Sequence, residues 1–145
     1  MRKRSIIALS TFLFIALVTL FLVSKLQTRE LNSRDYIQSR TPTLFFHGYG
    51  SSANAEKHMA EAVRKAGVTQ TIITATVDSH AQVTLKGDIP KDAVNPIVMV
   101  EFADNRNANY AQDGEYAAAV VRELQARYGF KKMNFVAHSM GNMSI

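Results

Sequence analysis

Short apolar segments alternate along this chain with segments of helical period, and this alternation restricts the fold more than any other feature of the sequence. Apolar or β-branched runs occupy residues 43–46, 71–77, 82–85, 97–102 and 134–137. The runs 71–77 and 82–85 are close enough in sequence to form a hairpin. Strands separated by helices predict an α/β fold with a mostly parallel sheet.

Two helices are expected between these strands. The first should be capped by Ser51 or Ser52 and end at Gly67, and the second should cover residues 113–128 and end at Gly129. The expected buried face of the first helix comprises Ala55, Met59, Ala62, Val63 and Ala66, and that of the second comprises Tyr116, Val120, Leu124 and Tyr128.

The formal net charge of +5 does not indicate a nucleic-acid partner, because the excess is confined to the start of the chain. Five basic residues and no acid lie in the first 29 positions, and from Glu30 onward the charges balance. The absence of cysteine excludes a disulfide framework, a thiolate metal site and a cysteine nucleophile. The four histidines are scattered, so we expect no metal and no cofactor.

The N-terminus has the pattern of an export segment. Nineteen uncharged residues, 5–23, follow Arg2-Lys3-Arg4, and a helix of this length just crosses a hydrocarbon core of about 30 Å. An uncleaved signal anchor is favoured over a cleaved signal peptide, because the stretch exceeds the usual apolar region of about 7–15 residues. A buried core helix is the third alternative.

These features predict three parts: a signal anchor or signal peptide at 1–24, a polar stalk at 25–40 and a domain at 41–145. Both export hypotheses place the domain outside the cytoplasmic membrane, either attached to its extracellular face through residues 5–23 or secreted.

The segment Ala137-His138-Ser139-Met140-Gly141 fits the pattern small-x-Ser-x-Gly at the end of a predicted strand. In a nucleophile elbow the serine occupies a strained strand-to-helix turn, and small residues on either side let neighbouring backbones pass. We therefore predict Ser139 to be a catalytic nucleophile, with an ordinary loop serine as the alternative.

The segment His47-Gly48-Tyr49-Gly50 follows an earlier strand, where an oxyanion-hole loop is found in serine hydrolases of this kind. Its glycines would let the backbone approach a substrate closely. The two N–H donors for a tetrahedral intermediate would be those of Tyr49 and Met140. The alternative is a glycine turn in which His47 has a structural role.

Four stretches together resemble a known family: residues 44–52, 56–59, 96–110 and 136–142. They are similar to the exported α/β-hydrolases of unknown function of Gram-positive bacteria, DUF915, which are often labelled as cell-surface hydrolases. The resemblance covers roughly residues 40–145. It implies the α/β-hydrolase fold, Ser139 as nucleophile and the His47-Gly48 loop at the oxyanion hole.

The chain departs from this family after Ser139. In the α/β-hydrolase fold the acid and the histidine of the triad follow the serine, and only six residues follow it here. We therefore expect an N-terminal fragment whose catalytic acid and base lie beyond Ile145. His138 is not expected to be the base, because neighbouring side chains at a sharp turn diverge. His58 and His80 receive no role.

The loop 104–109 is expected to be a solvated connection, with a place in the substrate cleft as the alternative. As a whole, the sequence predicts a serine hydrolase of the esterase, lipase or peptidase type that forms an acyl-enzyme with an acyl or peptidyl substrate. The alternative is a non-catalytic surface binding protein or an inactive remnant.

Overall fold

The structure, a computed structural model, describes residues 12–21 and 35–145, and the chain divides into two units, residues 1–30 and 31–145. Residues 12–21 are helical, and their side chains are exposed. Among the described residues, no helix is both long enough and apolar enough to cross a membrane. The remainder of the predicted signal or anchor segment, and most of the predicted stalk, lie outside the described residues.

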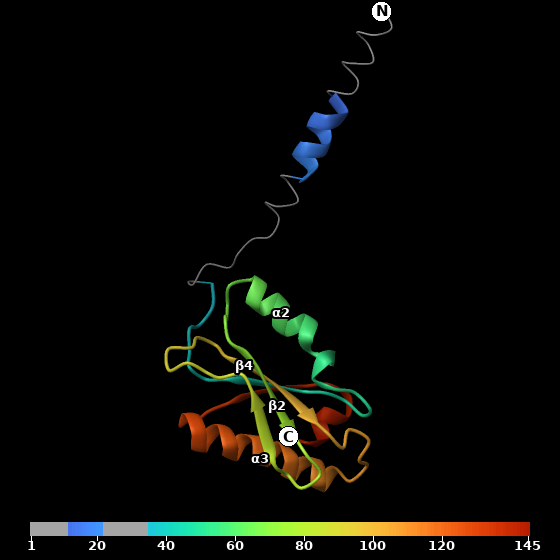
Figure 1. Cartoon of the computed structure of the whole chain (residues 1–145), viewed down its shortest axis with the longest axis vertical. Helices are drawn as coiled ribbons and strands as arrows, with labels where there is room; N and C mark the ends of the chain where they lie inside the picture. The colour runs from blue at the N-terminus through green and yellow to red at the C-terminus, as the bar shows by residue number, and fades with distance from the viewer. Residues whose placement is uncertain (1–11, 22–34) are drawn as a thin grey trace, which may run out of the picture. The chain divides into compact units, whose positions relative to one another are not determined.

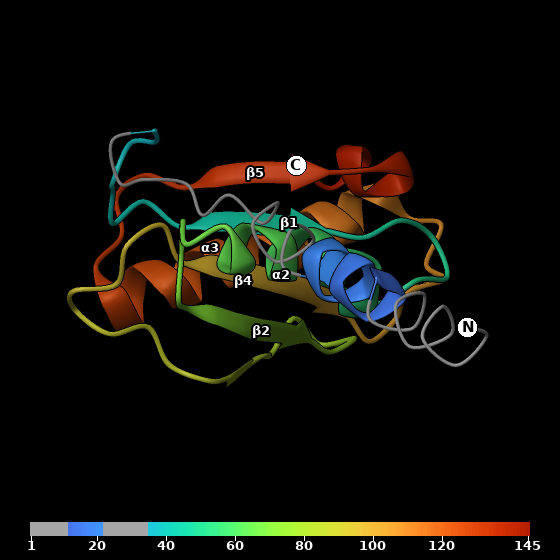
Figure 2. The ribbon, with the colours of Figure 1, turned by 90° about the horizontal axis from the view of Figure 1, so that it is seen from above.

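The second unit is built on a sheet with the strand order β3-β2-β4-β1-β5, and Figure 2 looks onto this sheet, with β5, β1, β4 and β2 side by side. The strands are β1 (Thr43–Phe46), β2 (Ile72–Val77), β3 (Val83–Lys86), β4 (Ile97–Phe102) and β5 (Asn134–Ala137). The pairs β1–β4, β1–β5 and β2–β4 are parallel, and β2–β3 is an antiparallel hairpin. The predicted α/β fold with a mostly parallel sheet is confirmed.

Helices cover both faces of the sheet (Figure 1). The short 3-10 helix η1 (Ala53–Ala55) and helix α2 (Lys57–Lys65) lie on one face, and α3 (Tyr110–Tyr128) lies on the other. The larger core lies between the sheet and α3 and includes Leu44, Phe46, Val98, Val100, Tyr116, Val120 and Leu124. The core under α2 is small and consists of Phe45, Ala60 and Ile97, with a few partly buried neighbours.

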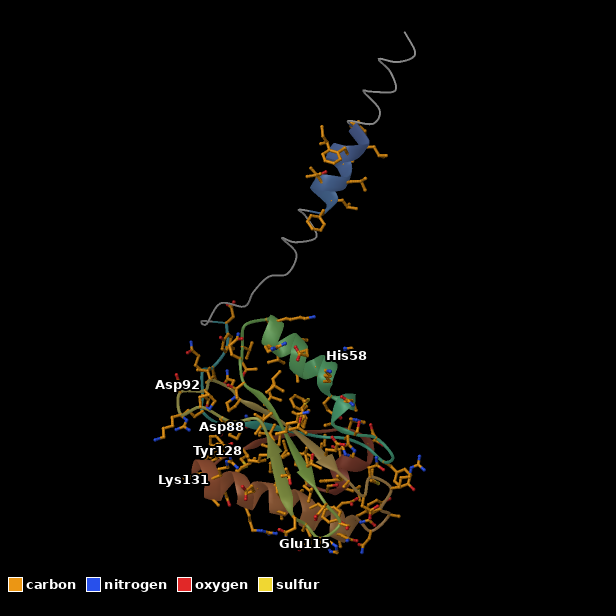
Figure 3. All side chains as sticks on the ribbon, in the orientation of Figure 1. His58, Asp88, Asp92, Glu115, Tyr128 and Lys131 are labelled. Carbon is orange, nitrogen blue, oxygen red and sulfur yellow. The ribbon has the colours of Figure 1, made fainter. Side chains whose placement is uncertain are left out.

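Helix α3 begins earlier than predicted. The side chain of Asn109 accepts a hydrogen bond from the N–H of Gln112, so the helix starts three residues before the predicted Asp113. The predicted end is confirmed, because Gly129 adopts the left-handed conformation with φ +71°. The hydroxyl of Tyr128 donates to Asp88 at 2.8 Å, which ties this end of α3 to the loop after β3 (Figure 3).

The predicted buried face of the first helix is wrong for Ala55, Met59 and Ala62, whereas Val63 packs against the core under α2. Met59 is 46% exposed and Ala62 is exposed, whereas Ala53, Glu56 and Ala60 are buried. The continuous helix assumed for the prediction is divided into η1 and α2 at Glu56, so the helical phase changes there. The buried residue at this junction is Glu56, and a prediction from hydrophobic periodicity places a charged residue of this kind on the exposed face.

Hydrogen bonds attach the last described residues of the predicted stalk to the second unit. The hydroxyl of Tyr36 donates to the carbonyl of Gly67 at 2.9 Å, and the Asn95 side chain donates to the carbonyl of Ile37 at 3.0 Å. Residues 36–41 therefore belong structurally to the domain.

Candidate active site

The carboxyl ends of β1, β4 and β5 meet at one edge of the sheet, which is where ligands bind in open α/β sheets. The pairing of Phe46 with Val100 and with Ala137 fixes this arrangement. It brings together the His47-Gly48-Tyr49-Gly50 loop after β1, the loop 103–109 after β4, and His138-Ser139 after β5. The predicted site segments, distant in sequence, are thus neighbours.

Ser139 lies at the junction of β5 with the 3-10 helix η2 (Ser139–Met143). Its φ is +52°, in the left-handed region that residues other than glycine rarely occupy. The side chain is exposed. A serine in a strained strand-to-helix turn, open to solvent, has the local geometry of a nucleophile elbow.

Position 141 has no room for a side chain, so glycine is required there. A Cβ at this position would lie 2.7 Å from the carbonyl oxygen of Phe46 and 2.8 Å from that of His47. Both contacts are with backbone atoms, which cannot move aside as a side chain can. The small residue two positions after the serine thus allows the elbow to pack against the end of β1.

The glycine loop after β1 contacts the elbow directly. A Cβ on Gly48 would lie 3.0 Å from the Cβ of Ser139 and 3.4 Å from its hydroxyl oxygen. Within the described residues, the backbone N–H groups of Tyr49 and Met140 donate no loop or turn hydrogen bond. These are the two groups that the sequence pattern assigned to the oxyanion hole.

The loop 103–109 holds the glycine loop in place. The N–H of Gly50 donates to the carbonyl of Asn105 at 2.6 Å, and the side-chain amide of Asn105 donates to the carbonyl of Ser51 at 2.6 Å. Asn105 therefore holds the glycine loop through two hydrogen bonds, and we refer to this pair of bonds as the clamp. The sequence predicted either a solvated connection or a place in the substrate cleft for this loop, and neither includes such a role.

His47 is buried, and both of its ring nitrogens are engaged. Nε2 accepts the N–H of Phe102 at 3.1 Å, and Nδ1 lies 2.8 Å from the carbonyl oxygen of Gly48. Because a carbonyl can only accept and a backbone N–H can only donate, the ring is neutral with its proton on Nδ1. His47 thus links the ends of β1 and β4, and it has no free nitrogen to act as a base for Ser139.

His138 contacts a residue that the sequence analysis did not select. Its Nε2 lies 2.8 Å from Oε1 of Glu56, whose side chain is only 2% exposed. The contact is short but lacks the alignment of a hydrogen bond, and both Glu56 oxygens are buried without a hydrogen-bond partner among the described residues. Within residues 35–145, no histidine is hydrogen-bonded to the Ser139 hydroxyl.

A second buried carboxylate, Asp113, lies near the start of α3. Burial raises the pKa of Asp113 above its ordinary value, and the hydrogen bond from the Asn107 amide at 3.3 Å opposes this effect. The charge of Asp104 adds to the rise in the pKa. The position of Asp113 at the first turn of α3 places it below the loop 103–109.

The described residues contain no group of three or more His, Cys, Asp or Glu side chains arranged to hold a metal ion. A groove of about 460 Å³ is lined in part by Thr43, Ile97 and Asn134, the first residues of their strands. It lies at the opposite end of the sheet from Ser139, so it is separate from the candidate site.

The solved structures that are similar to this chain include two proteins of Gram-positive bacteria. The product of the gene lin2722 from Listeria innocua is 28% identical, with a TM-score of 0.68 over 73% of this chain and 42% of that chain. A candidate cell surface hydrolase from Lactobacillus plantarum WCFS1 is 21% identical, with a TM-score of 0.56 over 67% of this chain and 39% of that chain, and shows the fold alone. The chain therefore spans less than half the length of either protein.

No curated protein matches this sequence significantly. The family model described as alpha/beta hydrolase of unknown function (DUF915) matches residues 30–145, which is most of the chain. The elbow at Ser139, the glycine loop beside it and the sheet topology agree with that match, and the protein belongs to the DUF915 family of alpha/beta hydrolases.

Proposed function

We propose that this protein is a serine hydrolase of the esterase, lipase or peptidase class, in which Ser139 forms an acyl-enzyme. The observation that carries the proposal is the position of Ser139. The residue follows β5 directly, its backbone has the left-handed conformation, and its side chain lies against the Gly48 loop. A loop serine without a special role would not need this strained conformation.

In the proposed reaction, Oγ of Ser139 attacks the carbonyl carbon of an ester or amide, and its proton passes to a histidine. The N–H groups of Tyr49 and Met140 stabilise the negative charge on the carbonyl oxygen. The histidine returns the proton to the leaving alcohol or amine. Water then hydrolyses the acyl-enzyme and regenerates the serine.

We propose that this histidine and its acid partner follow Ile145 in the complete protein. The 42% coverage of the Listeria chain supports this, since most of that fold has no counterpart here. The engagement of His47 and the contact of His138 with Glu56 support it further, because the two histidines nearest Ser139 have other partners.

We also propose that the domain acts outside the cytoplasmic membrane. The basic start and the uncharged segment 5–23 support export, and the Lactobacillus structure is described as that of a candidate cell surface hydrolase. Protease treatment of intact cells should degrade the domain. Protection of the whole protein in intact cells, with degradation after lysis, would contradict this localisation.

The full-length gene product tests the activity. With p-nitrophenyl esters, it should release a burst of nitrophenolate equal to the enzyme concentration, followed by slower turnover. Ser139→Ala should remove both phases, and Ser51→Ala, in the adjacent loop, should retain them. A folded protein that binds an ester without any burst or turnover would instead support the alternative, a non-catalytic binding protein.

A further inference from the structure

Glu56 is a buried carboxylate whose position is not explained by helix capping. It lies between η1 and α2, it is 1% exposed, and its side chain makes no capping hydrogen bond with α2. Neither carboxylate oxygen has a hydrogen-bond partner among the described residues. Burial of a carboxylate is costly, and an apolar side chain of similar size would avoid that cost. A role beyond stability would explain why a carboxylate occupies this position.

The side-chain contact of Glu56 leads directly to the elbow. Its Oε1 lies 2.8 Å from Nε2 of His138, and His138 immediately precedes Ser139. Glu56 belongs to the α2 side of the sheet and His138 to the end of β5, so the contact joins two elements that are far apart in sequence. The pair is asymmetric, because the His138 side chain is 51% exposed.

The His138 ring also borders the glycine loop. Its Cε1 atom lies 3.2 Å from the position of a Cβ on Gly48, and the Cβ of Ser139 lies 3.0 Å from the same position. The ring is thus held by Glu56 through Nε2 while its neighbouring carbon lies against Gly48. Any rotation of the ring away from Glu56 would change the packing beneath the glycine loop and beside Ser139.

We propose that Glu56 is a positioning residue for the nucleophile elbow, acting through His138 to hold Ser139 and the Gly48 loop in their reactive arrangement. This inference rests on the proposed function, because it takes Ser139 as the nucleophile. The elbow needs such support, because Ser139 has a strained backbone and η2, which begins at Ser139, is a 3-10 helix of only five residues.

The test uses the full-length gene product and the rate at which a fluorophosphonate probe labels it. Glu56→Gln keeps the size of the side chain and removes its charge. It should lower the maximal labelling rate constant by about tenfold to a hundredfold and leave the half-saturating probe concentration unchanged, because only the alignment of Ser139 is affected. Glu61→Gln, on the adjoining helix α2 and paired with Arg64 at the surface, is the matched control.

The coupling to His138 is tested with a double variant. His138→Gln should slow labelling to a similar extent, and Glu56→Gln combined with it should add little, because both changes remove one contact. His58→Gln, an exposed histidine on α2 (Figure 3), is the control for histidine loss and should label at the normal rate. Additive effects of the two substitutions would overturn the proposal.

Hydrogen exchange gives a readout that does not depend on activity. Glu56→Gln should increase exchange in a peptide covering residues 134–145 while α3 stays protected. Unchanged exchange there, or an unchanged maximal labelling rate, would overturn the positioning role. If Ser139→Ala still labels, the proposed nucleophile is wrong, and the exchange result alone then decides whether Glu56 holds the elbow.

Discussion

The backbone of Gly141 passes the carbonyl of Phe46 so closely that a Cβ at position 141 would lie 2.7 Å from that oxygen. Because the second-nearest atom is also a backbone oxygen, the strand end and the elbow would have to separate to admit any side chain. Their mutual position, and with it that of Ser139 relative to the Gly48 loop, depends on this one missing methyl group.

Gly141→Ala should therefore reduce activity about 100-fold or more, since displacements near 1 Å have effects of that size on catalysis. It should also lower the free energy of unfolding by about 1–3 kcal/mol, the usual cost of overpacking. Steady-state kinetics and urea unfolding measure the two effects. Gly114→Ala is the matched control, because nothing lies within 4 Å of its Cβ and alanine favours the helix there. Normal activity in Gly141→Ala would refute the close approach.

His47→Phe should destabilise the protein by about 1–3 kcal/mol, although the two rings are similar in size. Phenylalanine cannot accept the N–H of Phe102 or donate to the carbonyl of Gly48, so two buried backbone groups lose their partner. The comparison is His80→Phe, which replaces an exposed histidine. Equal unfolding free energies for the two variants would show that the His47 hydrogen bonds contribute nothing.

Asn105→Ala should lower the activity about tenfold with a smaller effect on stability, about 1 kcal/mol. The substitution removes the hydrogen bond to the Ser51 carbonyl and loosens the loop that carries Tyr49. Asn54→Ala, at an exposed position, should leave kcat unchanged. If both variants turn over at the normal rate, the clamp has no part in holding the oxyanion loop.

Much of the sheet could be predicted from the sequence, because the runs that form β1 and β4 each begin directly after a proline, and the runs that form β1 and β5 each end directly before a histidine. The Ser139 and Gly141 pattern also located the elbow, since its spacing reflects a local steric requirement. Glu56 could not be found in this way. Its burial results from the break between η1 and α2 and from a contact with His138 across the domain, and a local hydrophobic pattern contains neither.

The stability of the protein should depend on pH through Asp113. Burial raises the pKa of its carboxyl in the folded state, so the folded protein retains the proton where the unfolded chain has lost it. The protonated Asp113 carboxyl therefore contributes to the stability of the folded protein at low pH, and this contribution is lost as the pH rises through the folded-state pKa. Asp113→Asn removes this dependence, so its unfolding free energy relative to wild type should increase between about pH 4 and about pH 7. A difference that stays constant over this range would contradict the assignment, and Asp92→Asn is an exposed control (Figure 3).

The central claim is that Ser139 is the nucleophile, and mass spectrometry of the fluorophosphonate-treated full-length protein tests it most directly. The account predicts a single adduct on Ser139, formed faster than the adduct of the same probe with the free amino acid serine. The adduct should be absent from Ser139→Ala, and Ser51→Ala should be modified at the wild-type rate. An adduct on another residue, or none on a folded protein that retains esterase activity, would contradict the account.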